Sequence, residues 1–189
     1  MIHALDARCV LLPIDMQVGF DMPSWPPRNN PGQDANALRL MAGWREAGRP
    51  IIHVQHDSAE PGSTLAPGTK GHALRPGFAP QSGEALVHKS VNSAFIGTDL
   101  DLRLRRLGVS TIVAFGISTD MCVSTTVRMG ANLGYKMLVV GDACACFALP
   151  DGHGEIVPAD LVQRVHLATL GFEFATIVSV DEVLARLRD

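Results

Sequence analysis

The sequence has no hydrophobic run long enough to cross a lipid bilayer, which takes about 20 apolar residues in a helix. Its longest apolar stretches, such as residues 112–115, are only a few residues long. It also has no block of lysine or arginine, and its net charge is only −3. We therefore expect neither nucleic acid nor a membrane as a partner. The first six residues lack the basic and apolar regions of a secretory signal, so we expect none.

Cysteine is scarce, and its four copies do not form the pattern of a disulfide framework. Cys144 and Cys146 are too close together for an easy mutual bridge, and they lack the C-x-x-C spacing of redox motifs. Free thiols of this kind are typical of a reducing compartment, so we expect a cytoplasmic protein.

What the sequence does contain is an alternation of short apolar runs with helix-like segments. Its 189 residues, 47% of them hydrophobic, predict a single domain over residues 1–189. The predicted strands are residues 8–14, 50–55, 86–88, 111–115, 137–140 and 175–178. The predicted helices are residues 34–47, 98–107, 123–133, 159–170 and 180–188. Because the strands are continuous apolar runs, we predict an α/β fold, a three-layer α/β/α sandwich with a central, mostly parallel sheet.

Cys122 lies where a predicted strand turns into a predicted helix. Gly116 ends the strand, Ser118 and Thr119 offer capping oxygens, and the helix of residues 123–133 follows. A thiol at the positive end of a helix dipole is stabilised as its thiolate, the reactive form. A buried structural cysteine is the alternative that position alone leaves open.

Two charged residues also follow predicted strands. Asp15 comes directly after an apolar run, where a carboxylate needs a partner, although it could simply cap the next loop. Lys89 has small, apolar and aromatic neighbours, although a lone lysine is usually a solvated surface charge. Because the carboxyl ends of parallel strands meet at one edge, we expect both residues near Cys122. There the ammonium can stabilise a thiolate, and the carboxylate can carry a proton from the thiol to a leaving amine.

Three sequence blocks, in order and at consistent spacing over nearly the whole chain, carry a family resemblance. They are Asp15-Met16-Gln17 followed by Phe20, Lys89-Ser90-Val91-Asn92-Ser93-Ala94-Phe95 followed by Gly97-Thr98, and Gly116-Ile117-Ser118-Thr119-Asp120-Met121-Cys122-Val123. Together they resemble the signature blocks of the isochorismatase-like cysteine hydrolases.

This resemblance implies a Rossmann-like topology and a role for each matching residue. Cys122 corresponds to the nucleophile, Asp15 to the general acid/base and Lys89 to the charge partner between them. The resemblance also implies a cis peptide bond between Ile117 and Ser118. That bond would direct the backbone N–H of Ser118 and the N–H of Cys122 to one point, as an oxyanion hole.

Among the activities of this family, the cysteine favours hydrolysis of an amide-type C–N bond of a small molecule through a thioester intermediate. Isochorismatase itself, a vinyl-ether hydrolase, lacks that cysteine. Two alternatives remain open: hydrolysis of another bond in an isochorismate-like or cyclic substrate, and a non-catalytic binding protein that keeps the fold. The resemblance also implies a homo-oligomer, either a dimer or a tetramer.

Metal binding is not expected from the spacing of the histidines. Nicotinamidases of this family carry an Asp-x-His metal site after the second strand. The residues nearest to that position here are His53, His56, Asp57 and His72. Their spacing does not match, so we expect no metal and no cofactor. None of the seven histidines lies in a motif beside Cys122, and His88, next to Lys89, is the one we consider as an auxiliary.

The substrate pocket is predicted from residues close to the three blocks. These are Phe20, Trp25, Asn92, Phe95 and Met121. Core packing is the alternative for Phe20 and Phe95. Trp25 lies in a proline-rich loop, where an aromatic side chain often covers a small flat ligand. The Gly/Pro-rich connection of residues 56–80 is long enough to shape the pocket as well.

Overall fold

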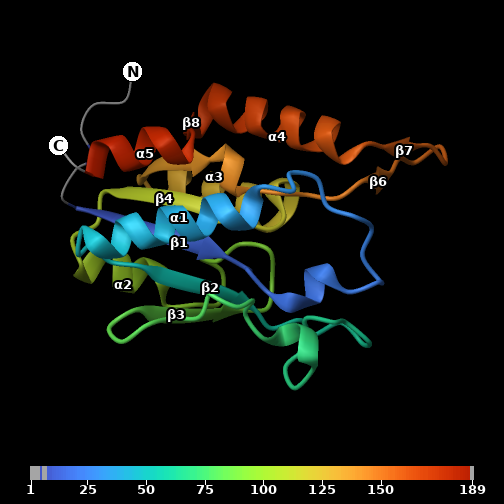
Figure 1. Ribbon diagram of the computed structural model, residues 1–189, viewed down its shortest axis with the longest axis horizontal. Coiled ribbons are helices and arrows are strands. Elements are labelled where there is room, and N and C mark those ends of the chain that lie inside the picture. The colour runs from blue at the N-terminus through green and yellow to red at the C-terminus, as the bar shows by residue number, and fades with distance from the viewer. Residues whose placement is uncertain (1–4, 6–7, 188–189) are drawn as a thin grey trace.

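A six-stranded parallel sheet forms the centre of the protein in the computed structural model, which describes residues 5 and 8–187 (Figure 1). The strands lie in the order β3-β2-β1-β4-β5-β8. Their bounds are Cys9–Ile14 (β1), Ile52–His56 (β2), Ala85–Lys89 (β3), Thr111–Gly116 (β4), Lys136–Val140 (β5) and Ala175–Val178 (β8). Every residue of β1 and β4 is buried, which explains why both are continuous apolar runs.

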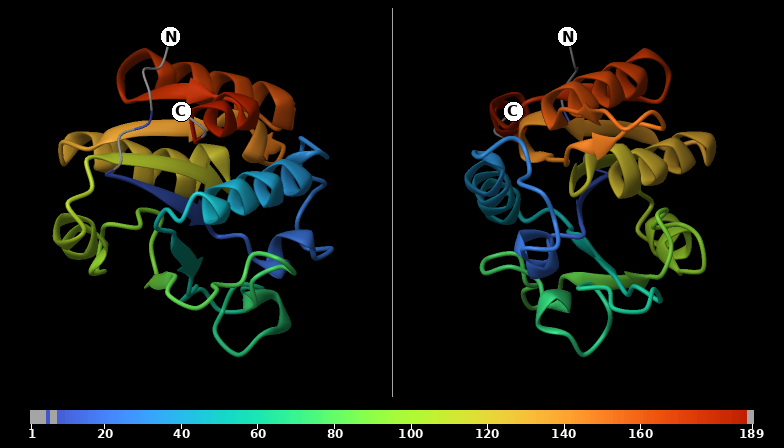
Figure 2. Two further views of the ribbon diagram at one scale, coloured as in Figure 1. Left: turned by 60° about the vertical axis from the view of Figure 1, so that its left-hand side comes forward. Right: turned by 90° about the vertical axis from the view of Figure 1, so that its right-hand side faces the viewer.

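Helices cover both faces of this sheet and complete three layers. They are α1 (Gln33–Glu46), α2 (Leu100–Arg106), α3 (Ser124–Asn132), α4 (Ala159–Glu173) and α5 (Val180–Leu187). Figure 2 shows α1 and α5 together on one face and α2 and α3 on the other. The predicted three-layer sandwich with a parallel sheet is therefore confirmed. Of the described helices, none is both long and apolar enough to span a membrane.

Several short elements were not predicted. They are the 3-10 turns Val18–Asp21 (η1), Lys70–His72 (η2) and Gly141–Ala143 (η4), and the two-residue strands Leu149–Pro150 (β6) and Ile156–Val157 (β7), which pair antiparallel. A π-helical turn, Thr119–Val123 (η3), precedes α3. Val123, the first residue of the predicted helix over residues 123–133, belongs to this turn. Most of the first six residues, where we expect no secretory signal, and the end of the predicted helix 180–188 lie outside the described residues.

The strand register brings the ends of four strands to one edge of the sheet. Ile14, the last residue of β1, pairs with Gly116 at the end of β4 and with Val54 in β2. In turn, His56 at the end of β2 pairs with Lys89 at the end of β3. The chain leaves β1 toward β2 and leaves β4 toward β5, on opposite sides. Parallel sheets bind their ligands at such a switch point.

Gly116 allows β1 and β4 to approach each other closely at this point. Its φ angle is +145°, and a Cβ atom there would lie 2.0 Å from the carbonyl oxygen of Ile14. A side chain at position 116 would therefore force β1 and β4 apart next to the residues that form the site. The close approach of these two strands requires glycine at this position.

Candidate active site

Asp15 follows β1 directly and turns the chain out of the sheet. Its φ angle of +52° is uncommon for a residue with a side chain. Its backbone N–H donates to the carbonyl oxygen of Val54 at 2.9 Å, which fixes this turn against β2. The carboxylate is fully buried. It therefore requires a charged partner close by.

Lys89 supplies that partner from the end of β3. Its Nζ lies 2.7 Å from Asp15 Oδ2, and neither side chain is exposed to solvent. The same Nζ donates to Cys122 Sγ at 3.3 Å and contacts His56 Nδ1 at 2.9 Å. One buried ammonium thus contacts the carboxylate, the sulfur and an imidazole. The predicted convergence of Asp15, Lys89 and Cys122 is present in the structure.

Cys122 lies in the π-helical turn η3, ahead of α3. It is 8% exposed, and its Sγ is placed 3.7 Å from Asn92 Oδ1, with the thiol as donor. Burial, and then the negative charge of Asp15, raise the pKa of the Cys122 thiol, although Lys89 opposes the shift. Burial thus opposes the stabilisation of the thiolate that the helix dipole provides.

Burial also shifts the pKa values of the other ionisable groups at the site. Burial raises the pKa of the Asp15 carboxyl, and the charge and hydrogen bond of Lys89 oppose this shift. Burial, followed by the charge of Lys89, lowers the pKa of His56. These shifts favour the neutral thiol of Cys122 and the neutral imidazole of His56 beside the Asp15–Lys89 salt bridge.

His56 is the site residue that the sequence did not predict. Its ring nitrogen, a carboxylate oxygen of Asp15 and the sulfur of Cys122 all lie within 4.8 Å of one another. No histidine motif surrounds Cys122 in the sequence, and His56 reaches the site only because β2 pairs in register with β3. The signal that could have found it is its place at the end of a predicted strand, beside other strand ends that carry polar residues.

The predicted pocket residues lie in three different surroundings. Asn92 contacts Cys122, and Met121, its chain neighbour, is 38% exposed. Phe20 and Trp25 instead pack with Phe147. The ring centroid of Trp25 lies 5.0 Å from that of Phe20 and 4.8 Å from that of Phe147. Trp25 also donates from Nε1 to Thr64 Oγ1 at 3.3 Å, which ties the proline-rich loop to the connection after β2.

Phe95 faces a different environment from the one predicted. Its ring stacks on Tyr135 at 6.0 Å between centroids. A Cβ atom added to Gly130 of α3 would lie 3.3 Å from its ring, so Phe95 packs against that helix. These contacts support the core-packing alternative for Phe95.

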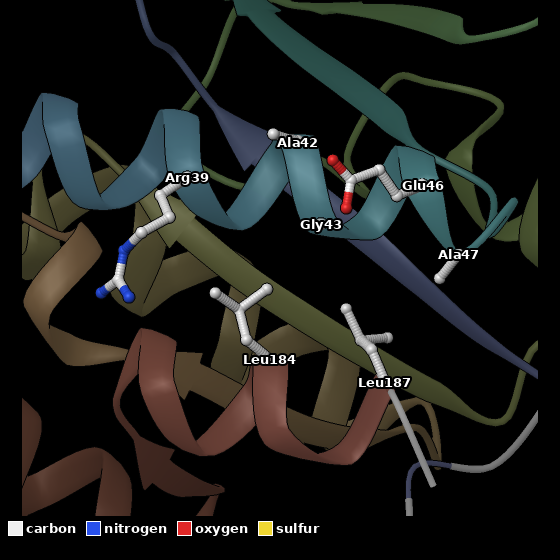
Figure 3. Close-up of a pocket in the computed structure, with 7 residues that line it drawn as sticks. All are labelled: Arg39, Ala42, Gly43, Glu46, Ala47, Leu184 and Leu187. Carbon is white, nitrogen blue, oxygen red and sulfur yellow. The ribbon is translucent and has the colours of Figure 1, made fainter.

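Two cavities of the described residues are lined by other side chains than the catalytic ones. One of about 540 Å³ is lined by Phe20, Asp21, Met22, Pro23, Trp25, Pro26, Pro27, Arg28 and Pro31. Another, of about 460 Å³, lies between α1 and α5 (Figure 3). It is lined by Arg39, Ala42, Gly43, Glu46, Ala47, Leu184 and Leu187. Asp15, Lys89 and Cys122 line neither cavity, and we assign no chemistry to the α1–α5 cavity.

A second polar cluster lies next to the site. Asp57 Oδ1 is 2.7 Å from His72 Nε2 and 3.0 Å from His88 Nδ1. These residue types and distances could hold a metal ion, but each contact is equally well explained as a hydrogen bond. His53, considered above with this group, instead contacts Glu84 at 2.7 Å.

The set of Asp15, His56 and Cys122 also has the ligand types of a metal site. The Lys89 ammonium contacts all three of these side chains, and its positive charge opposes a cation among them. The expectation that the catalytic residues work without a metal stays a prediction.

In the structure the peptide bond between Ile117 and Ser118 is cis. The turn that follows is held to its neighbours by backbone hydrogen bonds. Thr119 N–H donates to the carbonyl of Ala145 at 3.0 Å, and Val123 N–H donates to that of Ser118 at 3.1 Å.

Comparison with known proteins places these features in a family. Residues 9–156 match the model of the isochorismatase domain. An isochorismatase-family structure from Chromobacterium violaceum ATCC 12472 is 41% identical, with a TM-score of 0.94, and the alignment covers 100% of this chain and 99% of that one. The uncharacterised isochorismatase family protein YrdC of Bacillus subtilis is 36% identical over 95% of this chain and 96% of its own length.

A more distant relative has a named activity. The ureidoacrylate amidohydrolase RutB of Stutzerimonas stutzeri is 42% identical over 82 residues, which are 43% of this chain and 33% of that protein.

Proposed function

This chain belongs to the isochorismatase family of hydrolases, and we propose that it cleaves an amide-type C–N bond of a small molecule through a thioester on Cys122. The observation that carries this proposal is the position of Lys89 Nζ, 2.7 Å from Asp15 and 3.3 Å from Cys122. A nucleophile, a proton acceptor and a fixed positive charge are thereby in contact at the switch point of the sheet.

The first half of the reaction forms the thioester. Asp15 takes the proton of the Cys122 thiol as Sγ attacks the carbonyl carbon, and the electrons of the C=O double bond move to oxygen. Because burial disfavours a free thiolate, the proton leaves the thiol as the attack proceeds, and Lys89 balances the negative charge while it moves from Asp15 to sulfur.

Two backbone N–H groups are proposed to bind the resulting oxyanion. Among the described residues, the Ser118 N–H donates to no other backbone group. The Cys122 N–H lies in the turn ahead of α3, where first-turn amides lack acceptors inside the helix. Donors of this kind typically contribute about 3 kcal/mol each to lowering the barrier.

The tetrahedral intermediate then collapses: the C–N bond breaks, Asp15 gives its proton to the departing nitrogen, and the thioester is complete. The second half restores the enzyme. Asp15 then takes a proton from water as the water oxygen attacks the thioester carbon. The C–S bond breaks, Cys122 Sγ takes the proton back from Asp15, and a carboxylic or carbamic acid leaves.

An amide nitrogen as the leaving group agrees with the groups present. An amine leaves poorly unless it is protonated, and Asp15 is a buried acid beside the sulfur that can protonate it. The relative RutB is named as an amidohydrolase, which supports the same class of bond. Of the predicted pocket residues, Asn92 and Met121 are the two we retain as substrate contacts next to Cys122.

The proposal is tested by ammonia or amine release from a panel of small amides, ureides and lactams. We expect the wild type to hydrolyse at least one of them and Cys122→Ala to hydrolyse none. Cys146→Ala, which removes another buried free thiol, is the matched control and should keep its activity. Hydrolysis by Cys122→Ala at the wild-type rate would rule out the thioester route.

A further inference from the structure

The ammonium group of Lys89 has three protons and three acceptors around it. An ammonium carries three donors and no lone pair. In this site the three partners are Asp15 Oδ2 at 2.7 Å, His56 Nδ1 at 2.9 Å and Cys122 Sγ at 3.3 Å. Two of these partners, Asp15 and Cys122, take part in the proposed chemistry. His56 has no role in it so far.

The backbone of His56, the last residue of β2, is also fixed by a buried side chain outside β2. Its backbone N–H donates to Gln17 Oε1 at 2.9 Å, and its carbonyl oxygen accepts from Gln17 Nε2 at 3.0 Å. Gln17 is fully buried and lies two residues after Asp15. One side-chain amide therefore fixes both polar groups of the His56 backbone relative to the turn that carries the catalytic carboxylate.

We propose that His56 is a positioning residue for the reaction: its neutral ring, protonated on Nε2, accepts the third proton of Lys89 at Nδ1. With that proton held, the ammonium keeps its hydrogen bond to Cys122 Sγ and its ion pair with Asp15 Oδ2 together. The tetrahedral arrangement of the ammonium makes the three directions dependent on one another. This inference rests on the proposed function.

Loss of the acceptor at position 56 should lower the rate of acylation, which a loss of fold stability alone would not do. A buried donor without a partner is unfavourable, so the ammonium rotates toward any other acceptor that it can reach. Its contacts to Asp15 and Cys122 are then no longer both satisfied. Proton transfer to Asp15 slows, while binding of the substrate elsewhere in the pocket is unaffected. The rate constant for acylation should fall without a matching rise in the half-saturating concentration.

Variants at position 56 separate these effects. In His56→Asn the amide Oδ1 occupies nearly the position of the imidazole Nδ1 and keeps an acceptor. In His56→Leu the volume is kept and the acceptor is lost. The probe is p-nitrophenyl acetate: Cys122 Sγ bonds to the acetyl carbon, the C–O bond breaks, and p-nitrophenolate is released. We expect acetylation of His56→Leu to be about 10- to 100-fold slower than wild type, and that of His56→Asn to be within about threefold.

His53→Leu is the matched control, because His53 is a buried histidine of the same strand that contacts Glu84 and not Lys89. Its acetylation rate should match that of the wild type. Thermal unfolding of all variants shows whether each is folded.

A second measurement uses the unaltered protein, so it holds even if His56→Leu fails to fold. Long-range proton–nitrogen NMR of 15N-histidine-labelled protein identifies the protonated ring nitrogen, and at neutral pH we expect it to be Nε2 of His56. A proton on Nδ1, or a wild-type rate in folded His56→Leu while Cys122→Ala is inactive, would overturn this inference and leave the proposed function standing. Activity in Cys122→Ala would instead overturn the proposed function.

Discussion

Two segments meet at the site and are built in opposite ways: the nucleophile turn (residues 116–123) and the β2–β3 connection (residues 57–84). The nucleophile turn is short and is held by backbone hydrogen bonds, such as Ile117 N–H to the carbonyl of Ile14 at 3.1 Å. The β2–β3 connection is long, and much of its fixation comes from side chains. Arg75, for example, pairs with Asp34 of α1 at 2.8 Å.

The difference shows where the precision of the site comes from. On the nucleophile turn the position of Cys122 follows from the sheet itself, because β4 delivers it. On the other side, Gln17 and Gln55 both donate to the carbonyl of His72, at 2.9 and 2.7 Å, and these buried amides hold the connection against β1 and β2. We infer that the first segment supplies the nucleophile and that the second keeps the surroundings of Lys89 in place.

The largest effect is expected from removing the charge of Lys89, on which both segments depend. Lys89→Met leaves the buried Asp15 carboxylate without its cation, so it should lower the free energy of unfolding by about 3–5 kcal/mol at neutral pH. Hydrolytic activity should be lost as well. Chemical denaturation and the amide panel measure these two effects. Lys70→Met, which changes an exposed lysine of the β2–β3 connection, is the control. Equal stability of the two variants would contradict a buried ion pair.

The nucleophile turn alone is tested at the close approach of β1 and β4. Gly116→Ala places a Cβ atom 2.0 Å from the carbonyl oxygen of Ile14, so we expect a loss of at least about 3 kcal/mol in the free energy of unfolding. Gly134 also has a positive φ angle, of +92°, but open space around it. Gly134→Ala should therefore lose only about 1–2 kcal/mol, the cost of backbone strain. Similar losses would mean that the strand contact is not tight.

The β2–β3 connection is tested through its buried amides. Gln17→Leu removes the hydrogen bonds to both His56 and His72 and should lower the free energy of unfolding by about 2–3 kcal/mol. It should also slow acetylation of Cys122, because His56 is no longer fixed. Gln55→Leu removes only the bond to His72, so it should weaken the connection and leave the acetylation rate near that of the wild type. If both variants acetylated equally fast, fixation of His56 would have no role.

The smallest effect concerns the resting thiol. Burial and the charge of Asp15 raise the pKa of Cys122, so the fraction of thiolate at neutral pH is below that of an ordinary cysteine with a pKa of about 8.5. Alkylation by iodoacetamide should therefore be slow at neutral pH and keep rising as the pH passes the range in which a model thiol has levelled off. Fast alkylation below pH 7 would show that the helix dipole and Lys89 outweigh burial.

The sequence allowed the strands of the nucleophile side to be predicted because β1 and β4 are buried on both faces and read as continuous apolar runs. Asp15, Lys89 and Cys122 could be selected because each follows such a strand or lies in one of the three matching blocks. The blocks identify these three residues, but they do not give the distances between their side chains.

His56 also follows a predicted strand, residues 50–55, but it lies in none of the three blocks, so the sequence does not single it out. Its role depends on the register in which β2 pairs with β3, and no local pattern encodes that register. The helix dipole at Cys122 is visible in the sequence, whereas burial of the sulfur, which opposes the thiolate, is a property of the assembled fold. Phe95 was placed in the pocket by its position in a block, and its stacking on Tyr135 depends on packing between distant segments.

The most direct measurement is to locate the acyl group during turnover. The protein is mixed with p-nitrophenyl acetate, quenched in acid before the thioester hydrolyses, and analysed by intact mass and peptide mapping. A single acetyl group on Cys122, absent from Cys122→Ala, is the predicted result. Release of p-nitrophenolate with no acetyl on Cys122, or with the acetyl on another residue, would contradict the claim that this sulfur carries the covalent intermediate.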